Sequence, residues 1–146
     1  MIIAIASDHA GYDLKTEIRP FLEQIGLDVE DFGTYKNEAV DYPDYGILAA
    51  RAVAQKKADL GIIMCGSGIG MSIVANKVEG IRAALCCTAE MAEMSRRHND
   101  ANVLVLGGRM IDFDEAKKAV DVWLKTAFEG GRHLRRINKI HQLTGI

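Results

Sequence analysis

The sequence predicts a three-layer α/β fold, in which a five-stranded parallel sheet is flanked by helices and followed by a C-terminal helix. Three observations predict it. Short β-branched or continuously apolar runs recur five times, a segment of helical periodicity follows each run, and runs such as 2–6 and 60–64 are apolar throughout rather than alternating. Strands that are apolar on both faces are typical of a parallel sheet covered by helices on both sides. Because crossovers between parallel strands are right-handed, we expect a Rossmann-like arrangement.

The elements follow in order along the chain. The apolar runs that we expect to be buried strands are residues 2–6, 27–32, 60–64, 81–86 and 103–106. The segments with apolar residues three or four positions apart, expected to be helices, are residues 12–25, 45–55, 69–77, 88–97 and 115–128. Pro20 is expected to kink the first helix or to shift its boundary, and Gly26 to end it.

Composition indicates one globular domain, residues 1–146, because 49% of the residues are hydrophobic and 26% are charged. The 18 basic and 20 acidic residues leave a net charge of −2, which argues against nucleic acid or an anionic membrane as a partner. The apolar runs are far shorter than the roughly 20 residues of a membrane span. No signal-peptide pattern follows Met1, so we expect a cytoplasmic protein.

The three cysteines, Cys65, Cys86 and Cys87, form an odd set without a CxxC pair. This pattern fits neither a disulfide scaffold nor a zinc ribbon, and free thiols suit a reducing compartment. Cys86 and Cys87 are interpreted as packing at a strand end. Asp8 with His9, and Asp41 with Asp44, do not form a metal-ligand set of known spacing, so no metal is expected.

The segment 65–70, Cys-Gly-Ser-Gly-Ile-Gly, follows the third strand and opens a helix. Backbone N–H groups at such a turn favour an anion. The glycines at 66, 68 and 70 do not match the dinucleotide fingerprint, and the lysine of a P-loop is missing, so the pattern argues against NAD and ATP. The thiol of Cys65 beside these amides and the Ser67 hydroxyl is a candidate nucleophile or base. A small residue closing a strand is the alternative.

Residues 130–146 carry a formal charge of +4, and no acidic residue lies among them. On a helix, Arg132 and Arg136 share one face and can clamp a phosphate, although a solvated basic tail explains the same pattern. His98 and Asn99 end a helical pattern, so an imidazole and an amide can reach a substrate oxygen there. His9 and His133 are ambiguous when each is considered alone.

Eight motifs, in order and spacing, resemble the sugar-phosphate isomerase family that includes ribose-5-phosphate isomerase B. They are Ser7-Asp8-His9-Ala10-Gly11, Asp31-Phe32-Gly33-Thr34, Asp41-Tyr42-Pro43, Cys65-Gly66-Ser67-Gly68-Ile69-Gly70, Ala75-Asn76-Lys77, Gly80-Ile81-Arg82-Ala83, Ser95-Arg96-Arg97-His98-Asn99-Asp100-Ala101-Asn102 and Gly130-Gly131-Arg132-His133. The resemblance covers residues 2 to about 140.

The resemblance implies an aldose–ketose isomerase that interconverts ribose 5-phosphate and ribulose 5-phosphate in the non-oxidative pentose phosphate pathway, without cofactor or metal. It implies that Cys65 moves the proton between C1 and C2, that Ser67 belongs to the catalytic loop, and that His98 opens the furanose ring. Asn99 would stabilise the enediolate. The loop amides that would assist Asn99 are those of Gly66, Gly68 and Gly70. Residues implied to line the sugar are Asp8, His9 and Tyr42, and those implied to hold the phosphate are Arg109, Arg132, His133 and Arg136.

The resemblance further implies a homodimer or a dimer of dimers, with an active site shared between subunits. Three alternatives stay open. The chain can be an isomerase of allose 6-phosphate or another hexose phosphate, a phosphate-binding module without chemistry, or a flavodoxin-like redox or signalling domain. Fold class alone does not separate them.

Overall fold

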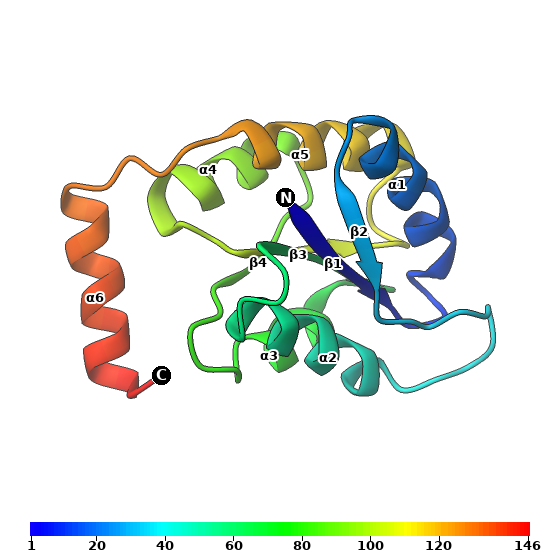
Figure 1. The fold of residues 1–146 in the computed structure, drawn as a ribbon, viewed down its shortest axis with the longest axis horizontal. Helices are drawn as coiled ribbons and strands as arrows, with labels where there is room; N and C mark the ends of the chain where they lie inside the picture. Colours follow the sequence, from blue (N-terminus) through cyan, green and yellow to red (C-terminus); the bar gives the residue numbers. More distant parts are fainter.

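The computed structural model describes residues 1–146 and contains one parallel sheet with helices on both faces (Figure 1). The strands are β1 (Ile2–Ser7), β2 (Asp28–Asp31), β3 (Leu60–Cys65), β4 (Ala83–Leu85) and β5 (Val103–Gly107). The helices are α1 (Tyr12–Gln24), α2 (Tyr42–Ala54), α3 (Ile69–Ala75), α4 (Ala89–Asn99), α5 (Phe113–Lys125) and α6 (Arg132–Thr144). The predicted five-stranded α/β fold with a C-terminal helix is confirmed.

The strands are arranged in the order β2-β1-β3-β5-β4, and all pairs are parallel. In the sheet, β2 lies on one side of β1, and β3, β5 and β4 follow in that spatial order on the other side. The order therefore reverses between β1 and β3. In open α/β sheets a ligand crevice forms at this point, beyond the carboxyl ends of the strands.

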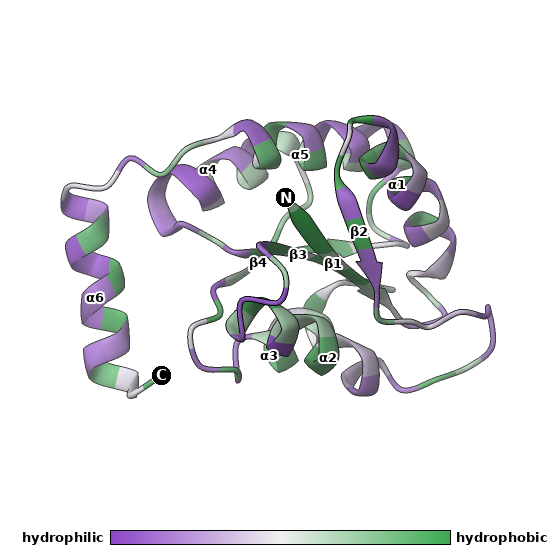
Figure 2. Cartoon of the chain, in the orientation of Figure 1, coloured by the Kyte–Doolittle hydropathy of each residue, from purple (hydrophilic) through white to green (hydrophobic).

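Side chains of alternate residues in the central strands pack into two separate cores, one on each face of the sheet. Ile3 and Ile5 point to the face covered by α1, α4 and α5, where Trp123 is fully buried. Ala4 and Ala6 point to the face covered by α2 and α3. Figure 2 shows the apolar strands enclosed between helices of mixed polarity. Because both strand faces are buried, the central strands show no polar alternation.

The two outer strands differ from the expectation of five buried strands. Asp28 and Glu30 of β2 are exposed, and the three residues of β4 are only half-buried. Both strands are also shorter than the sequence predicts. An edge strand has one neighbour only, so its ends lack a partner for pairing, and charged residues on it discourage association with other chains.

Helix boundaries shift by a few residues from those expected. Helix α2 begins at Tyr42, three residues early, because Pro43 fits the first turn, where no N–H is needed. Helix α1 continues through Pro20 to Gln24, so the proline does not shift the boundary. Gly26 lies just beyond its end with a φ of +86°, as a helix-ending glycine requires.

Helix α6 stands apart from the layered body, and the arrow of β1 points away from it (Figure 1). Ile137 and His133 are its buried residues, whereas Leu134, Ile140 and Leu143 are exposed. An amphipathic helix with an apolar side left in water is typical of a surface that contacts another molecule. None of the helices combines the length and the apolar character needed to cross a membrane.

Candidate active site

A pocket of about 400 Å³ lies beyond the carboxyl ends of β1, β3 and β5, beside the point where the strand order reverses. Residues that follow these strands form most of its wall, and Tyr42 from the start of α2 completes it. The lining residues are Asp8, His9, Ala10, Tyr42, Cys65, Gly66, Ser67, Gly70, Arg109 and Met110.

Cys65 is the last residue of β3, and its side chain is almost fully buried. The N–H of Gly68 donates to its sulfur at 3.2 Å, and the N–H of Ile69 donates to the Ser67 hydroxyl at 3.3 Å. Gly68 has a φ of +78°, a conformation that L side chains rarely adopt. The glycine therefore lets the chain fold back so that an amide faces the thiol, and N–H donation stabilises negative charge on sulfur.

The loop after β5 is joined to this turn by two backbone hydrogen bonds. The N–H of Gly108 donates to the carbonyl of Cys65 at 2.7 Å, and the N–H of Arg109 donates to that of Gly66 at 2.9 Å. A Cβ at Gly107 would lie 2.7 Å from the backbone oxygen of Ser67, so only glycine allows this close approach. The side chain of Arg109 is thereby held at the pocket.

The loop after β1 provides Asp8 and His9. The buried carboxylate of Asp8 accepts the N–H of Gly11 at 3.0 Å, which ties it to the start of α1. The Nδ1 of His9 accepts the N–H of Val40 at 3.2 Å. With Nδ1 acting as acceptor, the neutral ring carries its proton on Nε2, and His9 offers a hydrogen-bond donor.

Tyr42 lies against Gly70 across the mouth of the pocket. A Cβ at position 70 would lie 2.6 Å from the Tyr42 ring, so only glycine at this position leaves room for the ring. Tyr42 is 38% exposed, and its hydroxyl is a polar group on a mostly apolar ring. The pocket is therefore open at this side.

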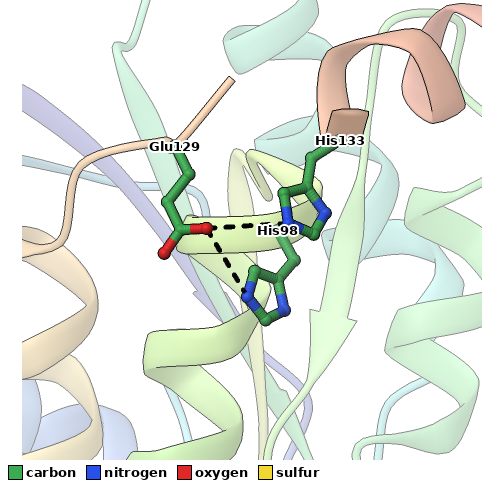
Figure 3. Close-up of side chains that lie close together, drawn as sticks. All are labelled: His98, Glu129 and His133. Carbon is green, nitrogen blue, oxygen red and sulfur yellow. Dashed lines mark ion pairs between the residues drawn. The ribbon is translucent and has the colours of Figure 1, made fainter. Parts of the chain in front are cut away.

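The remaining predicted residues lie elsewhere, in a cluster formed by the end of α4 and the start of α6. The imidazoles of His98 and His133 are stacked, with centroids 4.3 Å apart and ring planes 9° from parallel. Burial lowers the pKa of His133, and the neighbouring His98 and Arg132 lower it further. Glu129 faces both rings (Figure 3). Arg132 and Arg136 belong to α6, and Asn99 borders a second hollow under that helix.

The pocket residues lie at the carboxyl ends of the strands, and the His98 cluster lies at their amino ends. Asn99 and Asp100 accept hydrogen bonds from Arg82, which precedes β4, and the carbonyl of Asn102 accepts the N–H of Gly61 at the start of β3. Cys65 ends the same strand. Four residue steps, from Gly61 to Cys65, therefore separate the two groups, a distance of about 13 Å along β3.

The structure thus brings part of the predicted site together. Cys65, Ser67 and Arg109 share the pocket with the three residues expected to line the sugar, Asp8, His9 and Tyr42, and Gly68 donates to the thiol. His98, Asn99, Arg132, His133 and Arg136 do not reach it within one chain. Sequence analysis assigned no role to Ala10, Met110 or Glu129; Ala10 lies within a quoted motif, Met110 follows Arg109, and Glu129 precedes Gly130.

The interpretation of Cys86 and Cys87 as packing residues holds for one of them. Cys86 is buried, and burial raises the pKa of its thiol to about 11. Cys87 is exposed. The interpretation of Cys87 was wrong: the N–H of Cys86 still donates to the Val105 carbonyl of β5 at 3.1 Å, whereas Cys87 lies one residue beyond this pairing and is exposed.

Comparisons with known proteins place these features in one class, the sugar isomerases. The family model described as Ribose/Galactose Isomerase matches residues 3–140. Ribose-5-phosphate isomerase B of Escherichia coli is 47% identical over 138 residues, which cover 94% of this chain and 93% of the relative.

Solved structures agree. Ribose-5-phosphate isomerase B of Clostridium thermocellum is 54% identical and superposes with a TM-score of 0.98, covering 99% of this chain and 98% of that one. The enzyme of Mycoplasma genitalium, solved with bound ribulose-5-phosphate, is 44% identical with a TM-score of 0.95, covering 99% and 96%. The chain belongs to the ribose/galactose isomerase family.

Proposed function

We propose that the protein interconverts ribose 5-phosphate and ribulose 5-phosphate, as an enzyme of the non-oxidative pentose phosphate pathway. The observation that carries the proposal is the buried Cys65 thiol, which accepts the Gly68 N–H inside a pocket lined by polar groups. Relatives that carry this name, one of them solved with ribulose-5-phosphate, support the choice of substrate.

In this proposal the Cys65 thiolate removes the proton from C2 of the open aldose. The electron pair moves onto the carbonyl oxygen and gives an enediolate, a proton passes from the C2 hydroxyl to O1, and the thiol returns its proton to C1, which leaves the ketone at C2. A weakly acidic C–H needs a positioned base together with donors that stabilise the developing oxyanion. The amides of residues 66–70 and the Asn99 amide are those donors, and Asp8, His9 and Tyr42 hold the sugar hydroxyls.

The reaction also needs a group that opens the furanose and a cationic site for the phosphate. We propose that the ring-opening group and most of the phosphate site come from a second copy of the chain, because His98 lies at the amino ends of the strands and Cys65 at their carboxyl ends. The partner would supply His98 and Asn99, with Arg132, His133 and Arg136 as phosphate ligands, while Arg109 contributes from the Cys65 side. The active form would then be a homodimer, or a dimer of dimers.

Exposed apolar side chains beside each half of the site support this assembly. Ile69 and Ile73 lie one turn apart on α3, directly after the catalytic loop, and both are 56% exposed. Leu134 and Ile140 of α6 are about half-exposed near the other half. Covering both faces in one interface would remove apolar surface from water and would bring the two halves together.

Proton NMR of ribose 5-phosphate in D₂O containing EDTA tests the proposal. We expect ribulose 5-phosphate to form and deuterium to enter at C2, with EDTA having no effect. Ribose 5-phosphate that binds without conversion or exchange would indicate a binding module instead. Conversion of allose 6-phosphate at a higher kcat/KM than ribose 5-phosphate would assign the chain to hexose phosphates.

A further inference from the structure

Glu129, in the segment between α5 and α6, joins two parts of the candidate site that sequence analysis treated separately. Its Oε2 lies 3.9 Å from the Nε2 of His98 and 3.6 Å from the Nε2 of His133 (Figure 3). The three side chains come from different positions in the chain, the end of α4, the linking segment and the start of α6. One carboxylate therefore faces both imidazoles of a stacked pair.

The position of this carboxylate is fixed from its other side. Its Oε1 accepts hydrogen bonds from Nε of Arg97, at 2.7 Å, and from Nη2 of the same guanidinium. The N–H of Glu129 also donates to the carbonyl of Arg97 at 3.0 Å. Both donors reach the same oxygen, so these charge-assisted hydrogen bonds fix the position of Oε1. Glu129 is therefore held at both backbone and side chain, and Oε2 is directed at the histidines.

We propose that Glu129 is a positioning residue for opening of the sugar ring, acting through His98. This inference rests on the proposed function. Opening the furanose requires a proton to reach the ring oxygen while another leaves the hydroxyl at C1. A histidine performs both transfers when one nitrogen faces the sugar and the other is held. With Nε2 of His98 turned toward Glu129, Nδ1 is the nitrogen that faces the sugar.

The charge of Glu129 also bears on the stacked pair. When His98 takes up a proton, it becomes a cation directly over His133, with Arg132 and Arg136 close to the second ring. These groups oppose the imidazolium, and Glu129 is the acidic residue that faces it. A fixed carboxylate offsets part of this repulsion and keeps the protonated ring in place.

The same three side chains are a donor set that zinc accepts, and their ligand atoms all lie within 4.8 Å of one another. Their orientation argues against a metal site. An imidazole binds a metal through a lone pair in the plane of its ring, and two nearly parallel planes 4.3 Å apart do not direct their lone pairs to one point. The Arg97 guanidinium also occupies one oxygen of the carboxylate.

The test compares two rates that differ in their need for ring opening. Ribose 5-phosphate is a furanose and must open before Cys65 acts. Ribulose 5-phosphate is acyclic, because the oxygen that would close its ring carries the phosphate, so deuterium exchange at its C1 in D₂O bypasses opening. For Glu129→Gln we expect conversion of ribose 5-phosphate to fall about tenfold or more, relative to the exchange rate at C1.

Glu93→Gln is the matched control. Glu93 also accepts a hydrogen bond from Arg97, at 3.2 Å, and lies on α4 together with Arg97. We expect this variant to keep the wild-type ratio of the two rates. Arg97→Lys keeps the charge but loses the two-point contact, so it should lower the ratio in the same direction, and it serves where Glu129→Gln does not fold.

An unchanged ratio of the two rates in Glu129→Gln would overturn the role of Glu129. Where that variant does not fold, an unchanged ratio in Arg97→Lys would overturn it. A merely structural role would lower the two rates together and leave the ratio unchanged. Wild-type protein that shows neither conversion nor exchange would instead contradict the proposed function. The two failures are therefore distinguishable in the same experiment.

Discussion

Cys65 ends strand β3 at the carboxyl edge of the sheet, whereas His98 lies in the last turn of α4 at the amino edge. The chain has to cross the sheet between them. Helices that connect parallel strands run antiparallel to those strands, so the end of such a helix lies at the edge where the strands begin. This separation is the geometric basis for the proposed site shared between two chains.

Cys65→Ala is expected to lower kcat by about 10² to 10⁴ or more, because the proposed base is then missing. Initial-rate kinetics with ribose 5-phosphate and deuterium entry at C2 measure the loss. Ser67→Thr keeps a hydroxyl at the catalytic loop and serves as the control, with turnover close to that of the wild type. Full turnover by Cys65→Ala would remove the thiol from the mechanism.

Arg136→Ala is expected to raise KM more than it lowers kcat, since a phosphate ligand binds ground state and transition state alike. The charge-matched control is Lys139→Ala, which removes one exposed cation that is not among the predicted phosphate ligands from the same helix. Steady-state kinetics at constant ionic strength compare the two variants. An unchanged KM in Arg136→Ala would exclude this residue from the phosphate site.

The adjacent cysteines are expected to differ sharply in reactivity. Burial raises the pKa of Cys86 to about 11, so at pH 8 its thiol stays protonated, whereas Cys87 is exposed. Since the thiolate is the reacting species, an alkylating reagent should modify Cys87 first. Mass spectrometry of peptides from the alkylated Cys65→Ala variant measures this order without interference from the third thiol. Equal labelling of both cysteines would contradict the burial of Cys86.

Much of the fold could be predicted from the sequence because the central strands and the first helix have unmistakable patterns. Ile3 and Ile5 serve one core while Ala4 and Ala6 serve the other, which leaves β1 apolar throughout. The strand order could not be predicted, since apolar runs do not specify their neighbours. The bounds of the edge strands β2 and β4 were also predicted too long. Each of these strands pairs with one neighbour, and the extent of that pairing sets where the strand ends.

The sequence resemblance implied a candidate site shared between subunits, and within one chain the structure places its residues in two groups. Glycines reveal the Cys65 turn in the sequence, because a close backbone approach and a positive φ at Gly68 require them. The sequence motifs gave no indication of Glu129. Its role depends on the return of the chain from α5 to α6 past Arg97, a tertiary contact that no local pattern encodes.

A shared site predicts that two inactive variants restore activity when they assemble together. Cys65→Ala and His98→Asn each damage every site of their own homodimer. In a mixed dimer, one site combines Cys65 of one chain with His98 of the other and is intact, while the second site carries both changes. Random assembly from equal amounts makes half of the dimers mixed, so about a quarter of the sites should be active.

Co-expression of the two variants with different affinity tags, followed by purification through both tags, isolates the mixed dimers and measures their turnover. Half of the wild-type turnover per dimer is then expected, against residual activity in either homodimer. Two copies of Cys65→Ala, tagged and purified in the same way, provide the control for tag effects. Mixed dimers as inactive as their parents would contradict a site shared between chains. A 16.0 kDa species alone in sedimentation at micromolar concentration would contradict the dimer itself.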